Sequence, residues 1–155
     1  MTDTGSRPRE LGGDRRSHAP VPAGCPSSHV AALIEALEDA GGSYQGLPGL
    51  PGQAQFSVLD TGRPLVWVGG VGPWCDPDEF NDNNVAYFIA LHEFGHLRLG
   101  HGMPPRGSLD QLLNEIDAWR WALSNAVVPP SKDAWATLEA NLGSYVDEFI
   151  ARRRP

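Results

Sequence analysis

The sequence predicts one α+β domain with about four helices and a small β-hairpin sheet, arranged around a central apolar helix. Three observations predict this fold class. The chain has 155 residues, 41% of them hydrophobic, which is enough for one modest core. Two short runs rich in Val, Phe and Trp have the length and composition of strands. Four longer segments each follow a residue type that commonly caps a helix.

The N-terminal segment differs from the rest of the chain. Residues 1–27 are polar and charged and contain many Gly, Pro and Ser residues. A segment of this composition buries too little apolar surface to offset the entropy lost on ordering. We therefore expect a disordered N-terminal tail over residues 1–27 and a single folded domain over residues 28–155.

The first expected helix covers residues 29–40, in the segment HVAALIEALEDA. Ser27 or Ser28 is suited to cap its first turn, and the Gly-Gly pair that follows is suited to end it. The next segment, GLPGLPG at residues 46–52, is rich in turn-forming residues, so we expect a linker there.

The expected hairpin is formed by the runs QFSVLD at residues 55–60 and PLVWVGG at residues 64–70. The Thr-Gly-Arg segment between them suits a tight connection between antiparallel strands. Residues 72–84 have the composition of a loop and end in Asp and Asn residues, which are good helix caps.

Three further helices complete the domain. Residues 85–99 carry apolar side chains on every face of the expected helix, so we expect it to be buried on most sides. Ser108 caps a helix over residues 109–127, and Ser131 caps a last helix over residues 132–154.

Composition and charge argue against several classes of protein. The formal net charge is −7 and Lys and Arg gather mainly at the two ends of the chain, which disfavours direct binding of nucleic acid. No run of about 18 apolar residues is present, so we expect no membrane span. Two cysteines and no apolar N-terminal leader favour a cytoplasmic protein with reduced thiols.

The HEFGH segment in the central helix carries the chemistry. His92 and His96 are four residues apart, so their imidazoles stack on one helix face and can bind one zinc ion. Glu93 is rotated from His92 by about a third of a turn around the helix axis. Its carboxylate can therefore take a proton from a zinc-bound water and pass it to the leaving amine. The alternative is two core histidines bonded to carbonyls, with Glu93 in a surface ion pair.

A catalytic zinc ion needs a third protein ligand, and four downstream side chains are candidates: His101, Asp110, Glu115 and Asp117. His101 comes one residue too early for the pattern H-E-x-x-H-x-x-G-x-x-H. Glu115 lies at the edge of the apolar face of its helix, whereas Asp117 points away. We therefore expect Glu115 to be the ligand, the alternative being a salt bridge with an Arg.

The segments FIALHEFGHLRLGH and EIDAWRWA resemble the ImmA/IrrE family of small metallopeptidases, which are of the gluzincin type. Members carry an H-E-x-G-H segment, followed about twenty residues later by a glutamate-led E-x-E-A-N-x-F-A segment. The resemblance covers roughly residues 55–125. It implies a zincin-like fold, zinc bound by His92, His96 and Glu115, and a catalytic Glu93.

One position departs from the pattern of that family. Trp119 stands where members usually have Asn or Asp, a residue that normally orients a ligand histidine. Asp117, Asp110 or a backbone carbonyl are the candidates to take over this role. Stabilisation of a developing oxyanion is also left open, because four side chains could each donate a hydrogen bond to it: Tyr44, Tyr87, Tyr145 and His101.

The sequence thus predicts a zinc-dependent metallo-endopeptidase. The resemblance implies a specific intracellular protein substrate, such as a helix-turn-helix transcriptional repressor. An alternative is a zinc-binding regulatory or interaction module with weak or no proteolysis, which Trp119 and the short chain favour. A purely structural helical domain is a third hypothesis, and the absence of any bound metal would support it.

Overall fold

A computed structural model of the chain describes residues 24–72 and 78–154. Within these ranges it has a mixed α+β architecture of five helices and a three-stranded sheet. The elements follow in the order α1 (Pro26–Asp39), β1 (Ser43–Leu47), β2 (Ala54–Val58), β3 (Pro64–Gly69), α2 (Glu79–Asp82), α3 (Asn84–Arg98), α4 (Leu109–Asn125) and α5 (Lys132–Ala151).

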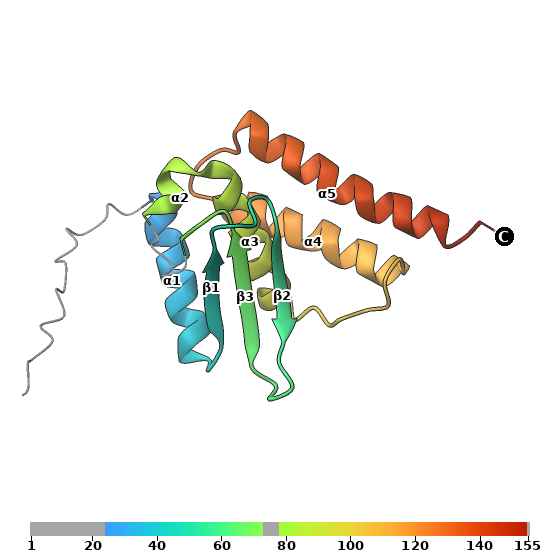
Figure 1. The fold of residues 1–155 in the computed structure, drawn as a ribbon, viewed down its shortest axis with the longest axis horizontal. Helices are drawn as coiled ribbons and strands as arrows, with labels where there is room; N and C mark the ends of the chain where they lie inside the picture. Colours follow the sequence, from blue (N-terminus) through green and yellow to red (C-terminus); the bar gives the residue numbers. More distant parts are fainter. Residues whose placement is uncertain (1–23, 73–77, 155) are drawn as a thin grey trace, which may run out of the picture.

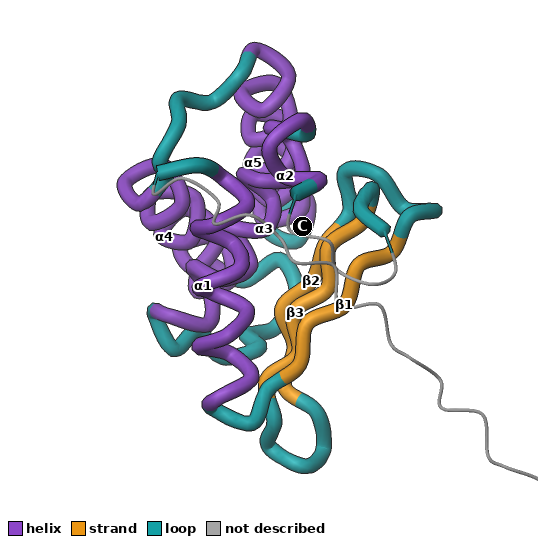
Figure 2. The backbone as a smooth tube through the Cα atoms, turned by 90° about the vertical axis from the view of Figure 1, so that its left-hand side faces the viewer, coloured by secondary structure: helices purple, strands orange, loops and turns teal. Residues whose placement is uncertain are grey.

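The sheet has the strand order β1-β3-β2, and the helices lie on one side of it (Figure 2). β3 pairs in parallel with β1 and antiparallel with β2, so that Tyr44 and Phe56 both flank Val66. These three side chains and that of Val68 are buried, whereas Gln45, Ser57 and Trp67, which alternate with them, are more exposed. This alternation is expected for a sheet that is covered on one face only.

Helix α3 lies at the centre of the molecule, behind the sheet in Figure 1. It packs most extensively against α4 and also contacts α1, β2, β3 and α5. Every residue from Ala86 to His96 is buried, as the apolar faces of this segment predicted. Within the described ranges, no helix combines the length and apolar character that crossing a membrane requires.

The hairpin and the three C-terminal helices form where the sequence predicted them. Ser108 and Ser131 cap α4 and α5 by accepting hydrogen bonds from backbone N–H groups in the first turn. Helix α5 continues through Gly143 without a break.

The predicted start of the first helix was wrong. The structure places Cys25 at the N-cap and Pro26 in the first turn, where a proline costs no hydrogen bond. Ser27, expected to be a cap or part of the tail, is fully buried and donates its N–H to Asn81. Most of the expected disordered tail lies outside the described residues.

Two more predictions need correction. Tyr44 and Gly46 belong to β1, although the segment from Gly46 onward was interpreted as a linker. Gly46 lies in a strand and not in a turn. A glycine is required there because a Cβ atom would collide with the carbonyl oxygen of Gly72. The predicted loop before α3 also contains α2, a short helix anchored by the fully buried Phe80.

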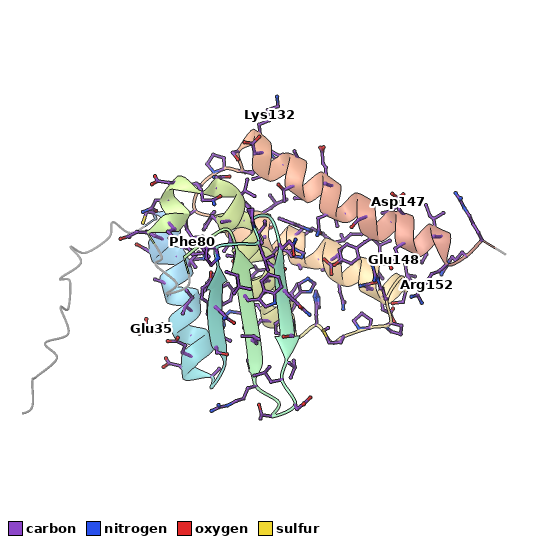
Figure 3. All side chains as sticks on the ribbon, in the orientation of Figure 1. Glu35, Phe80, Lys132, Asp147, Glu148 and Arg152 are labelled. Carbon is purple, nitrogen blue, oxygen red and sulfur yellow. The ribbon has the colours of Figure 1, made fainter. Side chains whose placement is uncertain are left out.

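The C-terminal part of α5 is tied to the loop that precedes α4. Glu148 forms an ion pair with Arg106, and the side chain of Arg152 lies against Gly107. Figure 3 shows Glu148 and Arg152 on the side of α5 that faces α4, with Asp147 on the opposite side. These contacts join the C-terminal part of α5 to the loop before α4.

Candidate metal centre

Helix α3 presents the HEFGH segment in the buried middle of the domain. Its N-cap is Asn83, whose side-chain oxygen accepts a hydrogen bond of 3.0 Å from the N–H of Ala86. His92, Glu93 and His96 are 4%, 7% and 8% exposed, although all three are polar. Buried polar groups require partners, so the surroundings of these side chains decide what they can do.

Close packing of α3 on α4 brings the third predicted ligand to the histidines. Gly95 faces the backbone of α4, and a Cβ atom at this position would lie only 2.9 Å from the carbonyl oxygen of Ala118. Ala118 is less than one helical turn beyond Glu115. The glycine of HEFGH therefore lets the two helices approach and places Glu115 beside His92 and His96.

The three side chains converge on one point. The Nε2 atom of His92 lies 3.0 Å from Oε2 of Glu115 and 3.1 Å from Nε2 of His96. His96 Nε2 is 3.6 Å from Oε1 of Glu115. Ligands of a tetrahedral zinc ion, at about 2.0–2.1 Å from the metal, lie roughly 3.3 Å from one another. This buried group of His92, His96 and Glu115 could therefore bind a metal ion.

Two of these groups are held in the ionisation states that bind metals. Burial lowers the pKa of His92, which keeps its imidazole neutral at pH 7. Burial alone would raise the pKa of Glu115. The hydrogen bonds and charge interactions with His92 and His96 outweigh that effect and lower its pKa to about 2. A neutral imidazole and an ionised carboxylate are the ligand forms of these residues.

Glu93 lies next to this group but is not part of it. Burial, followed by the negative charge of Glu115, raises its pKa to about 8, and a hydrogen bond from the backbone N–H of Phe56 opposes the shift. Without a cation nearby, the Glu93 carboxyl is therefore largely protonated at neutral pH. Its contact with Phe56 also fixes its carboxyl between α3 and the edge strand β2.

His101 supports His96 and does not join the three converging residues. Its Nδ1 atom lies 2.9 Å from Nδ1 of His96, so one of the two nitrogens donates a hydrogen bond to the other. If Nε2 of His96 binds a metal, Nδ1 carries the proton and His101 accepts it. The sequence pattern disfavoured His101 as a ligand because of its spacing, and the structure leaves it outside the three converging residues.

His92 has a different environment. Its ring stacks on Trp119, with 4.3 Å between the ring centroids and 28° between the planes. Within the described residues, its buried Nδ1 atom has no hydrogen-bond partner. Asp117, Asp110 and a backbone carbonyl were the candidates to orient a ligand histidine, and none of them bonds to Nδ1 of His92. Asp117 instead pairs with Arg120 at the surface.

Trp119 is itself held by α5, a contact that the sequence did not predict. Its Nε1–H donates a hydrogen bond of 2.8 Å to the side-chain oxygen of Asn141. The pattern of α4 shows that Trp119 faces the core, but not which residue of another helix receives its N–H. Such a partner depends on the angle at which α5 crosses α4.

A cleft of about 630 Å³ opens in front of the three converging residues. Its walls come from β2, from α3 and α4, from the loop at residues 102–104, and from one face of α5. Glu93 and Tyr145 line it, whereas Tyr44, Tyr87 and His101 do not.

Comparison of the chain with models of protein families, with curated proteins and with solved structures gave no match in any of the three. Functional inference therefore depends on the site geometry and on the residues themselves.

Proposed function

We propose that this protein is a zinc-dependent peptidase with a zincin-like active site, in which His92, His96 and Glu115 bind the metal and Glu93 moves the proton. The observation that carries the proposal is the convergence of three buried ligand atoms at the wall of a cleft, next to a buried carboxyl group. Two imidazoles and one carboxylate that leave a position open match the ligand set of catalytic zinc ions.

Hydrogen bonding alone explains the group poorly. His92 Nε2 has two close neighbours, a carboxylate oxygen at 3.0 Å and an imidazole nitrogen at 3.1 Å. One proton on Nε2 cannot serve both contacts well, and without it a lone pair would face the carboxylate. A cation between the three atoms would satisfy every lone pair at once.

The proposed reaction is hydrolysis of a peptide bond. The metal would lower the pKa of the attacking water and polarise the substrate carbonyl. Glu93 accepts a proton from the water while the water oxygen attacks the carbonyl carbon. It returns that proton to the amide nitrogen as the C–N bond breaks. A nearby cation would bring the pKa of Glu93 down from about 8, so that its carboxylate is ready to act as a base.

The edge strand beside the cleft supports a peptide substrate. Gln53 accepts a hydrogen bond from Gly69 of β3, and Leu59 donates one to Arg63 just before β3. By alternation, the backbone groups of Ala54 and Phe56 point away from β3. Both of these residues line the cleft. The N–H of Phe56 is already donated to Glu93, so the groups left to bind an extended peptide by strand addition are the N–H and carbonyl of Ala54 and the carbonyl of Phe56. The resemblance to ImmA/IrrE proteins favours a protein substrate of the repressor type.

The Glu93→Gln variant tests the proposed reaction. Zinc-loaded wild-type protein and the variant are incubated with an unstructured peptide mixture, and new peptide termini are identified by mass spectrometry. We expect reproducible cleavage by the wild type and none by the variant, with equal zinc content in both. Equal cleavage by the two proteins would contradict the role of Glu93.

A second candidate function is a zinc-binding module without proteolysis. The unpartnered Nδ1 of His92 favours it, because a ligand histidine usually donates this proton to an acceptor that strengthens metal binding. A protein that binds one zinc ion but cleaves no peptide, and that tolerates Glu93→Gln in cells, would support this function over the first.

A further inference from the structure

Of the four side chains that could stabilise an oxyanion, three are used elsewhere or lie away from the cleft. The Tyr87 hydroxyl accepts a hydrogen bond from the N–H of Val127 and lies 2.9 Å from Nδ1 of His29. Tyr44 stacks on Phe94 in the core. His101 contacts Nδ1 of His96, on the side of that ring away from the converging Nε2 atom.

Tyr145 has the position that the other three lack. It lines the cleft on the same face of α5 as Thr137 and Asn141, which are eight and four residues before it. The same cleft is lined by Glu115, one of the three converging residues. A donor in the wall of this cleft faces the space in which a substrate carbonyl would approach the open position of the metal.

A tyrosine hydroxyl ordinarily ionises only at about pH 10, so the Tyr145 hydroxyl can act as an O–H donor over the physiological pH range.

Building on the proposed function, we propose that Tyr145 is a catalytic residue that donates a hydrogen bond to the carbonyl oxygen of the scissile peptide. As the water oxygen forms its bond to the carbonyl carbon, the π electrons of the C=O bond move to the carbonyl oxygen. Glu93 takes the proton that the water loses. When the C–N bond breaks, the electrons return to re-form C=O and the nitrogen receives the proton from Glu93. Tyr145 keeps its own proton throughout.

The test compares zinc-loaded wild-type protein with Tyr145→Phe. The probe is the tightest binder from a set of phosphinic pseudopeptides with randomised flanking residues, because a phosphinate has the charge and tetrahedral shape of the intermediate. Three affinities are measured by calorimetry: for Zn²⁺ alone, for the phosphinate, and for the matching amide peptide in a Glu93→Gln background. Tyr87→Phe is the matched control, since it removes a tyrosine hydroxyl outside the cleft.

We expect Tyr145→Phe to weaken phosphinate binding by about tenfold or more while Zn²⁺ and amide-peptide affinities change by less than about twofold. Equal phosphinate binding in wild type and variant would overturn the role of Tyr145 but leave the proposed function standing. A parallel fall in Zn²⁺ affinity would also overturn it, making Tyr145 a positioning residue for Glu115. Failure of the wild type to bind Zn²⁺, or any of the phosphinates, would overturn both proposals.

Discussion

Helices α3 and α5 both contribute to the cleft, but they are held in the domain in different ways. In α3, every residue from Ala86 to His96 is buried. In α5, only Ala134 and Leu138 of its 20 residues are buried. The side chains that converge on one point come from α3 and its close neighbour α4, and the outer wall comes from α5. A metal site needs fixed ligand positions, whereas a substrate wall needs access from solvent.

The largest expected difference between the two helices concerns a buried carboxyl group. In metal-free protein, the pKa of Glu93 is about 8, against an ordinary value of 4.5. Between these values the unfolded chain ionises and the folded chain does not, so folding stability falls as pH rises from 4.5 to 8. Glu93→Gln removes this loss. Near pH 8 the free energy of unfolding of the variant should therefore exceed that of the wild type by a few kcal/mol, since each pKa unit is worth about 1.4 kcal/mol.

The measurement is urea unfolding of both proteins in the presence of a chelator, at several pH values between 4 and 9. Glu139→Gln is the control, because Glu139 lies on the exposed side of α5 and should give the profile of the wild type. Parallel profiles for wild type and Glu93→Gln would show that Glu93 is not buried as described.

A second difference concerns the glycines of the two helices. Gly95→Ala in α3 adds a Cβ atom 2.9 Å from the carbonyl oxygen of Ala118 and forces α3 and α4 apart. We expect a loss of about 1–3 kcal/mol of folding stability, reduced by the better helix propensity of alanine. Zinc affinity, measured by competition with a chelator, should also fall because Glu115 moves with α4. Unchanged stability and zinc affinity would contradict the close packing of the two helices.

The smallest effect is expected in α5, and it has the opposite sign. At Gly143 an added Cβ atom meets no other atom within 4 Å. Gly143→Ala should therefore stabilise the protein by about 0.5–1 kcal/mol, through helix propensity alone. Thermal unfolding of Gly95→Ala, Gly143→Ala and wild type under the same conditions makes the comparison. Destabilisation by Gly143→Ala would mean that α5 packs more tightly there than described.

The same contrast explains how much could be predicted from the sequence. α3 and α4 were predicted from capping residues and apolar patterns, the i and i+4 spacing placed His92 and His96 on one face, and the edge of the apolar face of α4 indicated Glu115. These are local periodicities, which a sequence shows directly.

The features that could not be predicted depend on contacts between distant segments. β1 was missed because Gly46 looked like a turn residue, whereas it is required by the approach of Gly72. The stacking of Trp119 on His92, its bond to Asn141 and the place of Tyr145 all depend on where α5 lies. The sequence predicted that α5 is a helix but contained no signal for its position.

The central claim is that His92, His96 and Glu115 together bind one metal ion. The most direct measurement is the zinc content, by inductively coupled plasma mass spectrometry, of wild type and His96→Ala purified without added metal. We predict about one zinc ion per chain in the wild type and less than about a tenth of that in the variant, since two ligands hold zinc poorly. A metal-free wild type that also fails to take up added Zn²⁺, or equal zinc in both proteins, would contradict the claim.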